Sequence, residues 1–92
     1  MISEEELIKH KWKYIPESHS WTKLGVTFRD VDRPLNHYTI HFADKLVFSI
    51  ITPTLSDLEH CIKRGVSIIF SNRMYHYLLS IKQKRTLKNW IL

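Results

Sequence analysis

The segment between residues 37 and 52 constrains the fold more than any other part of the chain. From His37 to Phe42, polar and apolar residues alternate one for one, which is typical of a β-strand with one buried face. The short polar stretch 43–45 follows, and residues 46–52 are then dense in β-branched and aromatic side chains. This pattern predicts two antiparallel strands joined by a tight turn.

The segment before this hairpin carries a similar but weaker strand pattern. Residues 21–31 are rich in β-formers, with Val26 and Phe28 alternating against polar neighbours, and the polar residues 32–34 end the run. We therefore expect two or three antiparallel strands within residues 21–52. Lysines also alternate with Trp12 and Tyr14, which allows a further short strand there.

The first residues predict a short helix. Ser3 followed by Glu6 has the spacing of a capping box, in which the serine hydroxyl and the glutamate each satisfy a free backbone amide. We expect this helix over residues 3–11. The acidic run that includes Glu4 and Glu5 is the opposite of a cationic secretion signal, so a cytoplasmic location is expected.

A second helix is predicted over residues 54–64. Ser56 and Glu59 repeat the capping-box spacing, and apolar residues recur there at helical intervals. Gly65 follows at a place where a helix commonly ends in a left-handed cap. The apolar residues 66–70 fit a buried strand or the start of a helix equally well.

The pattern of residues 70–92 predicts a helical region at the C-terminal end. An apolar stripe starts at Phe70, but Lys84, Arg85 and Lys88 fall on the same stripe if the helix is continued. Lysines do not belong on a core face, so we expect this helix to end or bend near residues 82–86.

These elements predict an α+β fold within a single domain, residues 1–92. We expect a small antiparallel sheet of about three strands, packed against two or three helices that form a single layer on one face. A hydrophobic content of 43% and an aromatic content of 12% exclude a disordered chain. The longest charge-free stretches are far below the roughly 20 residues of a membrane-spanning helix, so no span is expected.

The chemistry-bearing residues do not form a recognisable catalytic or metal motif. Cys61 is the lone cysteine, which excludes an internal disulfide and a multi-cysteine metal site. His37 and His41 are four residues apart, but on a strand their Cα atoms lie about 13 Å apart, too far to share one ion. No cofactor or small-molecule substrate is implied, and an enzyme is not expected. The least favoured alternative is a small endoribonuclease that uses His37, His41 and Arg73.

The positive charge of the chain is concentrated at its C-terminal end. The net charge is +5, and residues 61–92 contain basic residues but no acidic residue. Such an asymmetry can attract an anionic partner, although a solvated face explains it equally well. The residues predicted to contact nucleic acid or an acidic partner are Lys63, Arg64, Lys82, Lys84, Arg85 and Lys88.

The last residues form an apolar end that follows this basic stretch. Trp90, Ile91 and Leu92 either anchor an interface with a partner or fold back beneath the sheet. We expect a small, soluble, non-enzymatic interaction module that binds a protein partner or a second copy of itself as a homodimer. A basic nucleic-acid-binding protein that uses the C-terminal third is the alternative.

Overall fold

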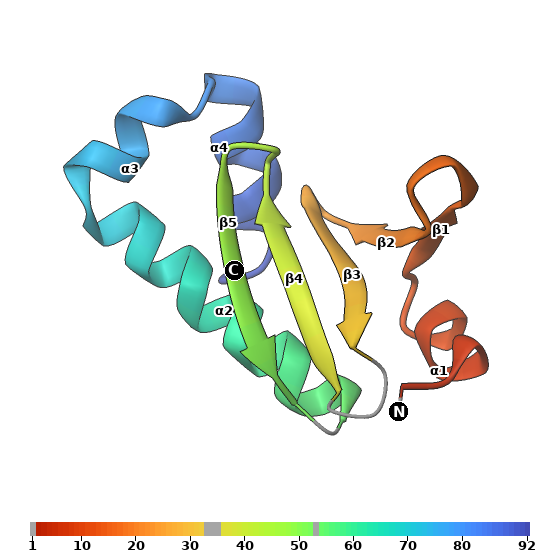
Figure 1. Ribbon diagram of the computed structural model, residues 1–92. Coiled ribbons are helices and arrows are strands. Elements are labelled where there is room, and N and C mark those ends of the chain that lie inside the picture. Colours follow the sequence, from red (N-terminus) through yellow and green to blue (C-terminus); the bar gives the residue numbers. More distant parts are fainter. Residues whose placement is uncertain (1, 33–35, 53) are drawn as a thin grey trace.

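The computed structural model describes residues 2–32, 36–52 and 54–92. Within these residues the chain forms one α+β domain with a five-stranded antiparallel sheet and four α-helices (Figure 1). The strands pair in chain order and are β1 (Lys13–Ile15), β2 (Ser20–Lys23), β3 (Val26–Asp32), β4 (His37–Phe42) and β5 (Leu46–Ile51). The helices are α1 (Glu4–Lys9), α2 (Leu55–Ser71), α3 (Arg73–Leu78) and α4 (Ile81–Lys88).

The predicted α+β class is confirmed, but the sheet has five strands where about three were expected. The run 21–31 is divided by a tight turn at Leu24 and Gly25, whose φ angles are +48° and +80°, so Lys23 pairs with Val26. Two successive positive φ angles are typical of the turn that joins two-residue hairpins. The short strand β1, which the sequence allowed, adds the fifth member.

The predicted hairpin of β4 and β5 is confirmed. The two strands pair from His37 with Ile51 to Phe42 with Leu46. Ala43 and Asp44 turn the chain with φ angles of +54° and +58°. The Lys45 amide closes this turn by donating a hydrogen bond of 3.0 Å to the Phe42 carbonyl.

The two faces of the sheet differ in burial. Val26 and Phe28 of β3 point to the same face as three residues of β4, and all five are buried (Val26, Phe28, Tyr38, Ile40, Phe42). They form the core with the inner face of α2, which lies against this side of the sheet (Figure 1). The opposite face carries Thr27, Thr39 and His41, which are only partly buried.

Helix α2 is longer than predicted. Its side-chain cap is Thr54, whose hydroxyl accepts a hydrogen bond of 3.1 Å from the Asp57 amide, so the predicted Ser56–Glu59 capping box is wrong. The helix continues through Gly65 to Ser71, and residues 66–70 are therefore helical.

Gly65 serves a close approach between helix and sheet, and the prediction that it ends the helix is wrong. A Cβ atom at this position would lie 2.7 Å from Cζ of Phe42, closer than a real Cβ contact allows. The glycine lets α2 cross β4 at this point with the Phe42 ring directly beneath it.

The C-terminal region forms two short helices in place of one longer helix. Asn72 caps α3 through its side-chain oxygen, and Ser80 forms a capping box with Gln83 at the start of α4. The chain therefore breaks before α4, and the expected end or bend near residues 82–86 is wrong, because α4 is continuous through them.

Helix α4 packs beside the β2–β3 and β4–β5 turns, and its Leu87 lies in the same buried core as the inner face of α2. Gln83 donates a hydrogen bond of 3.0 Å from Nε2 to the Ala43 carbonyl in the β4–β5 turn. Thr86 and Leu87 lie against Gly25 in the β2–β3 turn. No helix within the described residues is long and apolar enough to cross a membrane.

Candidate functional site

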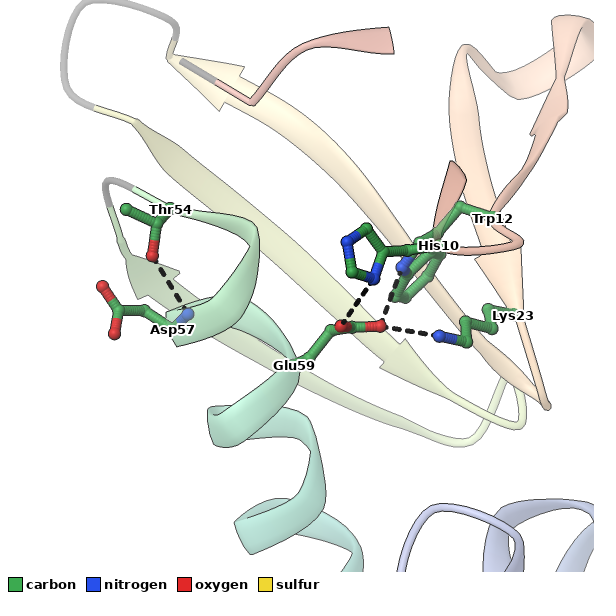
Figure 2. A network of polar contacts seen from close by, with 6 residues as sticks. All are labelled: His10, Trp12, Lys23, Thr54, Asp57 and Glu59. Carbon is green, nitrogen blue, oxygen red and sulfur yellow. Dashed lines mark hydrogen bonds and ion pairs between the residues drawn. The ribbon is translucent and has the colours of Figure 1, made fainter. Parts of the chain in front are cut away.

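A network of polar contacts is centred on Glu59 of α2 (Figure 2). The Lys23 ammonium donates to Glu59 Oε2 at 2.7 Å, and the Trp12 indole nitrogen donates to the same oxygen at 3.2 Å. His10 Nδ1 lies 3.9 Å from Oε1. One carboxylate thus joins α2 to the segment that follows α1 and to β2.

Two tryptophan rings complete this cluster. The Lys23 ammonium lies 5.2 Å from the centre of the Trp90 ring and 5.8 Å from that of Trp12, within the range of cation–π attraction. The carboxylate and the ammonium are satisfied by groups of the protein itself. We interpret the cluster as a structural junction that holds the N-terminal segment and the C-terminal end to α2.

A cavity lies between the N-terminal residues and the sheet. Its lining includes Tyr14, His19 and Tyr38, and the Tyr14 hydroxyl lies 3.1 Å from His19 Nδ1. Burial raises the pKa of Tyr38, and the charge of Asp30 adds to this, against a lowering effect of the Ile2 backbone. A phenol is protonated at neutral pH at its ordinary pKa, and a further rise disfavours the phenolate that would act as a base or nucleophile.

The residues considered for ribonuclease chemistry are not gathered in one cavity. His37 and His41 lie on strand β4, and His41 lines a cavity together with Arg29 and Thr39. Neither His37 nor Arg73 lines that cavity. Within the described ranges, no group of three or more His, Cys, Asp or Glu side chains could hold a metal ion.

The predicted basic contact residues lie on two helices and face different surroundings. Lys63 and Arg64 belong to α2, whereas Lys82, Lys84, Arg85 and Lys88 belong to α4. Lys63 lines a polar cavity with Glu6, Arg64 lines an apolar groove with Phe48, and Lys82 lies near the β2–β3 turn with Gly25. Contact of this set with nucleic acid stays a prediction.

Of the three predicted interface anchors, Trp90 lies in the core of its own chain. Only 5% of it is exposed, its ring centre is 5.8 Å from that of Trp12, and its indole nitrogen donates to the Leu24 carbonyl at 3.1 Å. The anchor interpretation of Trp90 is therefore corrected, because the ring is already packed. Ile91 and Leu92 are exposed, and their role stays a prediction.

An apolar groove of about 220 Å³ lies between β5 and α2. Ile40 and Phe42 of β4 line it together with two side chains of β5 and four residues of α2 (Phe48, Ile50, Cys61, Arg64, Gly65, Ile68). Because α2 crosses the sheet at Gly65 above Phe42, β5 lies to one side of the helix and is only partly covered.

Strand β5 is also an edge of the sheet, since it pairs with β4 on one side only. Its six residues include no charge and no proline, and Val47 and Ile51 are 56% and 70% exposed. Sequence reasoning identified this strand but not its exposure. The lack of charge across residues 46–51 is compatible with an unprotected edge strand. A fully buried strand shows the same pattern, so the sequence alone does not distinguish the two.

Known proteins give no guide to this surface. Comparison with protein-family models, curated proteins and solved structures finds no match to the chain. The groove, the edge strand beside it and the charges around both are the features that bear on function.

Proposed function

We propose that this protein is a non-enzymatic interaction module that binds an extended segment of a partner protein along the free edge of β5. The observation that carries the proposal is a six-residue edge strand without charge or proline beside an apolar groove. Proteins normally protect such an edge with charges, prolines, bulges or a covering segment. Where the edge is left open, strand addition is a common mode of peptide recognition.

The backbone of β5 supplies the first part of the binding energy. Every second residue of an edge strand directs its amide and carbonyl away from the sheet, where no neighbouring strand satisfies them. An added strand would pair with these groups and become a sixth strand beside β5. Such hydrogen bonds do not depend on the side chains of the partner, so they give affinity but little selectivity.

The side chains on both faces of β5 supply the second part. Phe48 faces the groove, and Val47 and Ile51 lie on the opposite face. Complete burial of one such side chain contributes roughly 1.5–3 kcal/mol. An added strand whose side chains alternate between the two faces would cover all three, which favours a β-branched or aromatic segment.

Peptide display tests this proposal without a known partner. The full-length protein is used to select from a library of random peptides, and an enriched peptide is titrated into labelled protein while amide chemical shifts are followed. We expect shifts along β5 and in α2 around Gly65. The double variant Val47→Lys, Ile51→Lys should lose binding, because two added lysines protect the edge.

The matched control is Tyr77→Lys, which also places a lysine at an exposed apolar position, 85% exposed, but on α3. It should leave peptide binding unchanged. Shifts confined to α4, or equal loss of binding in the control and the β5 variant, would contradict strand addition at β5.

A further inference from the structure

We infer, on the basis of the proposed function, that the segment bound beside β5 is an apolar strand that carries an acidic side chain, and that Arg64 recognises this acid. The charge at the groove, the surroundings of Arg64 and the charge distribution of the chain support this chemistry of the partner.

Arg64 is placed to pair with a ligand, because among the described residues no ion pair includes it. Among the described residues that line the groove, it alone carries a charge. The positions one turn away on α2 are His60 and Ile68, and neither is acidic. Within the described ranges both ion pairs involve Glu59, and neither includes Arg64.

The position of Arg64 beside apolar side chains makes a carboxylate its most favourable partner. A guanidinium can donate two parallel hydrogen bonds to a carboxylate, and such charge-assisted pairs are stronger than neutral hydrogen bonds. An added strand would exclude water from the groove and thereby reduce screening of the pair. The acid would stand on the face of the added strand that is directed towards α2.

The positive charge of residues 61–92 also favours an anionic segment. No acidic residue occurs in residues 61–92, and this stretch contains α3, α4 and most of α2. Lys63 lies beside Arg64 on α2, and Arg73 begins α3. Basic groups on adjoining elements attract an acidic partner during encounter and disfavour a basic one.

The same charges disfavour a second copy of the chain as the occupant. The strand that a second copy would add, residues 46–51, contains no acid that could pair with Arg64. Pairing about a two-fold axis perpendicular to the sheet would also bring a second Arg64 to the same face. Like charges brought together in an interface oppose association.

Charge reversal provides the test. The variants Arg64→Glu and Lys63→Glu make the same change at adjacent exposed positions of α2, but Lys63 lines a different cavity. Wild-type protein and both variants select from the same displayed peptide library. The best peptide of the wild-type pool is then synthesised with its acid and with the matching amide, and both affinities are measured by fluorescence anisotropy.

We expect the wild type and Lys63→Glu to enrich Asp or Glu among β-branched residues, and Arg64→Glu to enrich Lys or Arg instead. Replacing the acid by its amide should weaken binding to the wild type by at least about fivefold, because fivefold is the upper range for an exposed ion pair and this pair is shielded from water, and it should not weaken binding to Arg64→Glu. Circular dichroism confirms that each variant is folded.

The outcomes separate this inference from the proposed function. Peptides that shift the amides of β5 but carry no preferred acid, with equal affinity for Arg64→Glu, leave strand addition standing and overturn the acid recognition. Enriched peptides that produce no shift at β5 overturn both. A homodimer in light scattering that the Val47→Lys, Ile51→Lys double variant dissociates would identify a second copy as the occupant and overturn the acidic partner.

Discussion

The two edges of the sheet are built in opposite ways. Strand β1 has three residues, begins with Lys13 and is followed directly by Pro16, which cannot donate a backbone hydrogen bond. Strand β5 has six residues, includes neither charge nor proline and exposes Val47 and Ile51. Short length, lysine and proline are the features that protect edge strands against pairing with another chain.

The two edges also differ in the side chains and helices that pack next to them. Near β1 and β2, Trp12, Lys23 and Glu59 are joined to one another and to the C-terminal end. Near β5, α2 passes to one side and leaves an apolar groove that contains Arg64. The first region is organised for stability, whereas the second leaves backbone and apolar groups available. Substitutions should therefore affect stability in the first region and binding in the second.

The largest loss of stability is expected from Trp90→Ala. This change removes the ring beside Trp12 and the hydrogen bond to the Leu24 carbonyl, and it leaves a cavity in the core. Replacing a buried tryptophan by alanine typically costs about 3–5 kcal/mol in the free energy of unfolding. Urea unfolding monitored by circular dichroism measures the difference.

Leu92→Ala is the matched control for Trp90→Ala. Leu92 is 89% exposed, so the free energy of unfolding should stay within about 0.5 kcal/mol of the wild type. Similar losses in both variants would show that the C-terminal end does not pack as one buried ring followed by exposed residues.

A smaller loss is expected from Glu59→Gln. The amide has the shape of the carboxylate but no charge, so the Lys23 ammonium loses its ion pair in a partly buried site. Loss of a buried hydrogen-bond partner costs about 1–3 kcal/mol, and the same range is expected here because Lys23 is only partly buried and the amide oxygen can still accept from it. Asp57→Asn on the same helix is the control, and its loss should stay below about 1 kcal/mol, because Asp57 contributes only through the helix dipole. Equal losses in urea unfolding would refute the structural role of the Glu59 cluster.

A substitution at Gly65 tests the crossing of α2 over β4. Gly65→Ala places a methyl group 2.7 Å from the buried Phe42 ring, and overpacking of this kind costs about 1–3 kcal/mol. Alanine regains about 0.5–1 kcal/mol of helix propensity, so a net loss of up to about 2.5 kcal/mol is expected. Ser67→Ala at an exposed position of the same helix should instead stabilise slightly. A stabilised Gly65→Ala variant would show that Gly65 is not a close contact.

The sequence predicted what depends on local patterns. The β4–β5 hairpin follows from alternation and a short polar turn, and the start of α1 follows from Ser3, whose hydroxyl accepts from the Glu6 amide. The turn at Leu24 and Gly25 was missed because it lacks the Asn-Gly or Asp-Gly pair that usually marks such turns. The role of Gly65 was misread because a glycine that ends a helix and one that permits a close contact look alike in a sequence.

The groove could not be predicted, because it depends on contacts between distant elements. Phe48 and Val47 belong to a run that fits a buried strand, and their exposure follows from the position of β5 at the edge and from the line along which α2 crosses β4. Arg64 was identified by charge alone. Its place beside the groove becomes visible only when α2 is seen to continue past Gly65.

The smallest effect on stability is expected from substitutions that add a lysine to the β5 edge and remove the lysine from the β1 edge. These two substitutions also test the contrast between the edges most directly. Val47→Lys adds a lysine to β5 at an exposed position, so the free energy of unfolding should change by no more than about 0.5 kcal/mol. Any association through β5 should nevertheless weaken, because the lysine must be desolvated when another strand pairs there.

Lys13→Val makes the opposite change in β1 and should not create a binding edge, since β1 ends after three residues at Pro16. Light scattering and peptide titration of both variants measure the result, and new association of Lys13→Val would show that a single lysine, and not the length of the strand, protects the β1 edge.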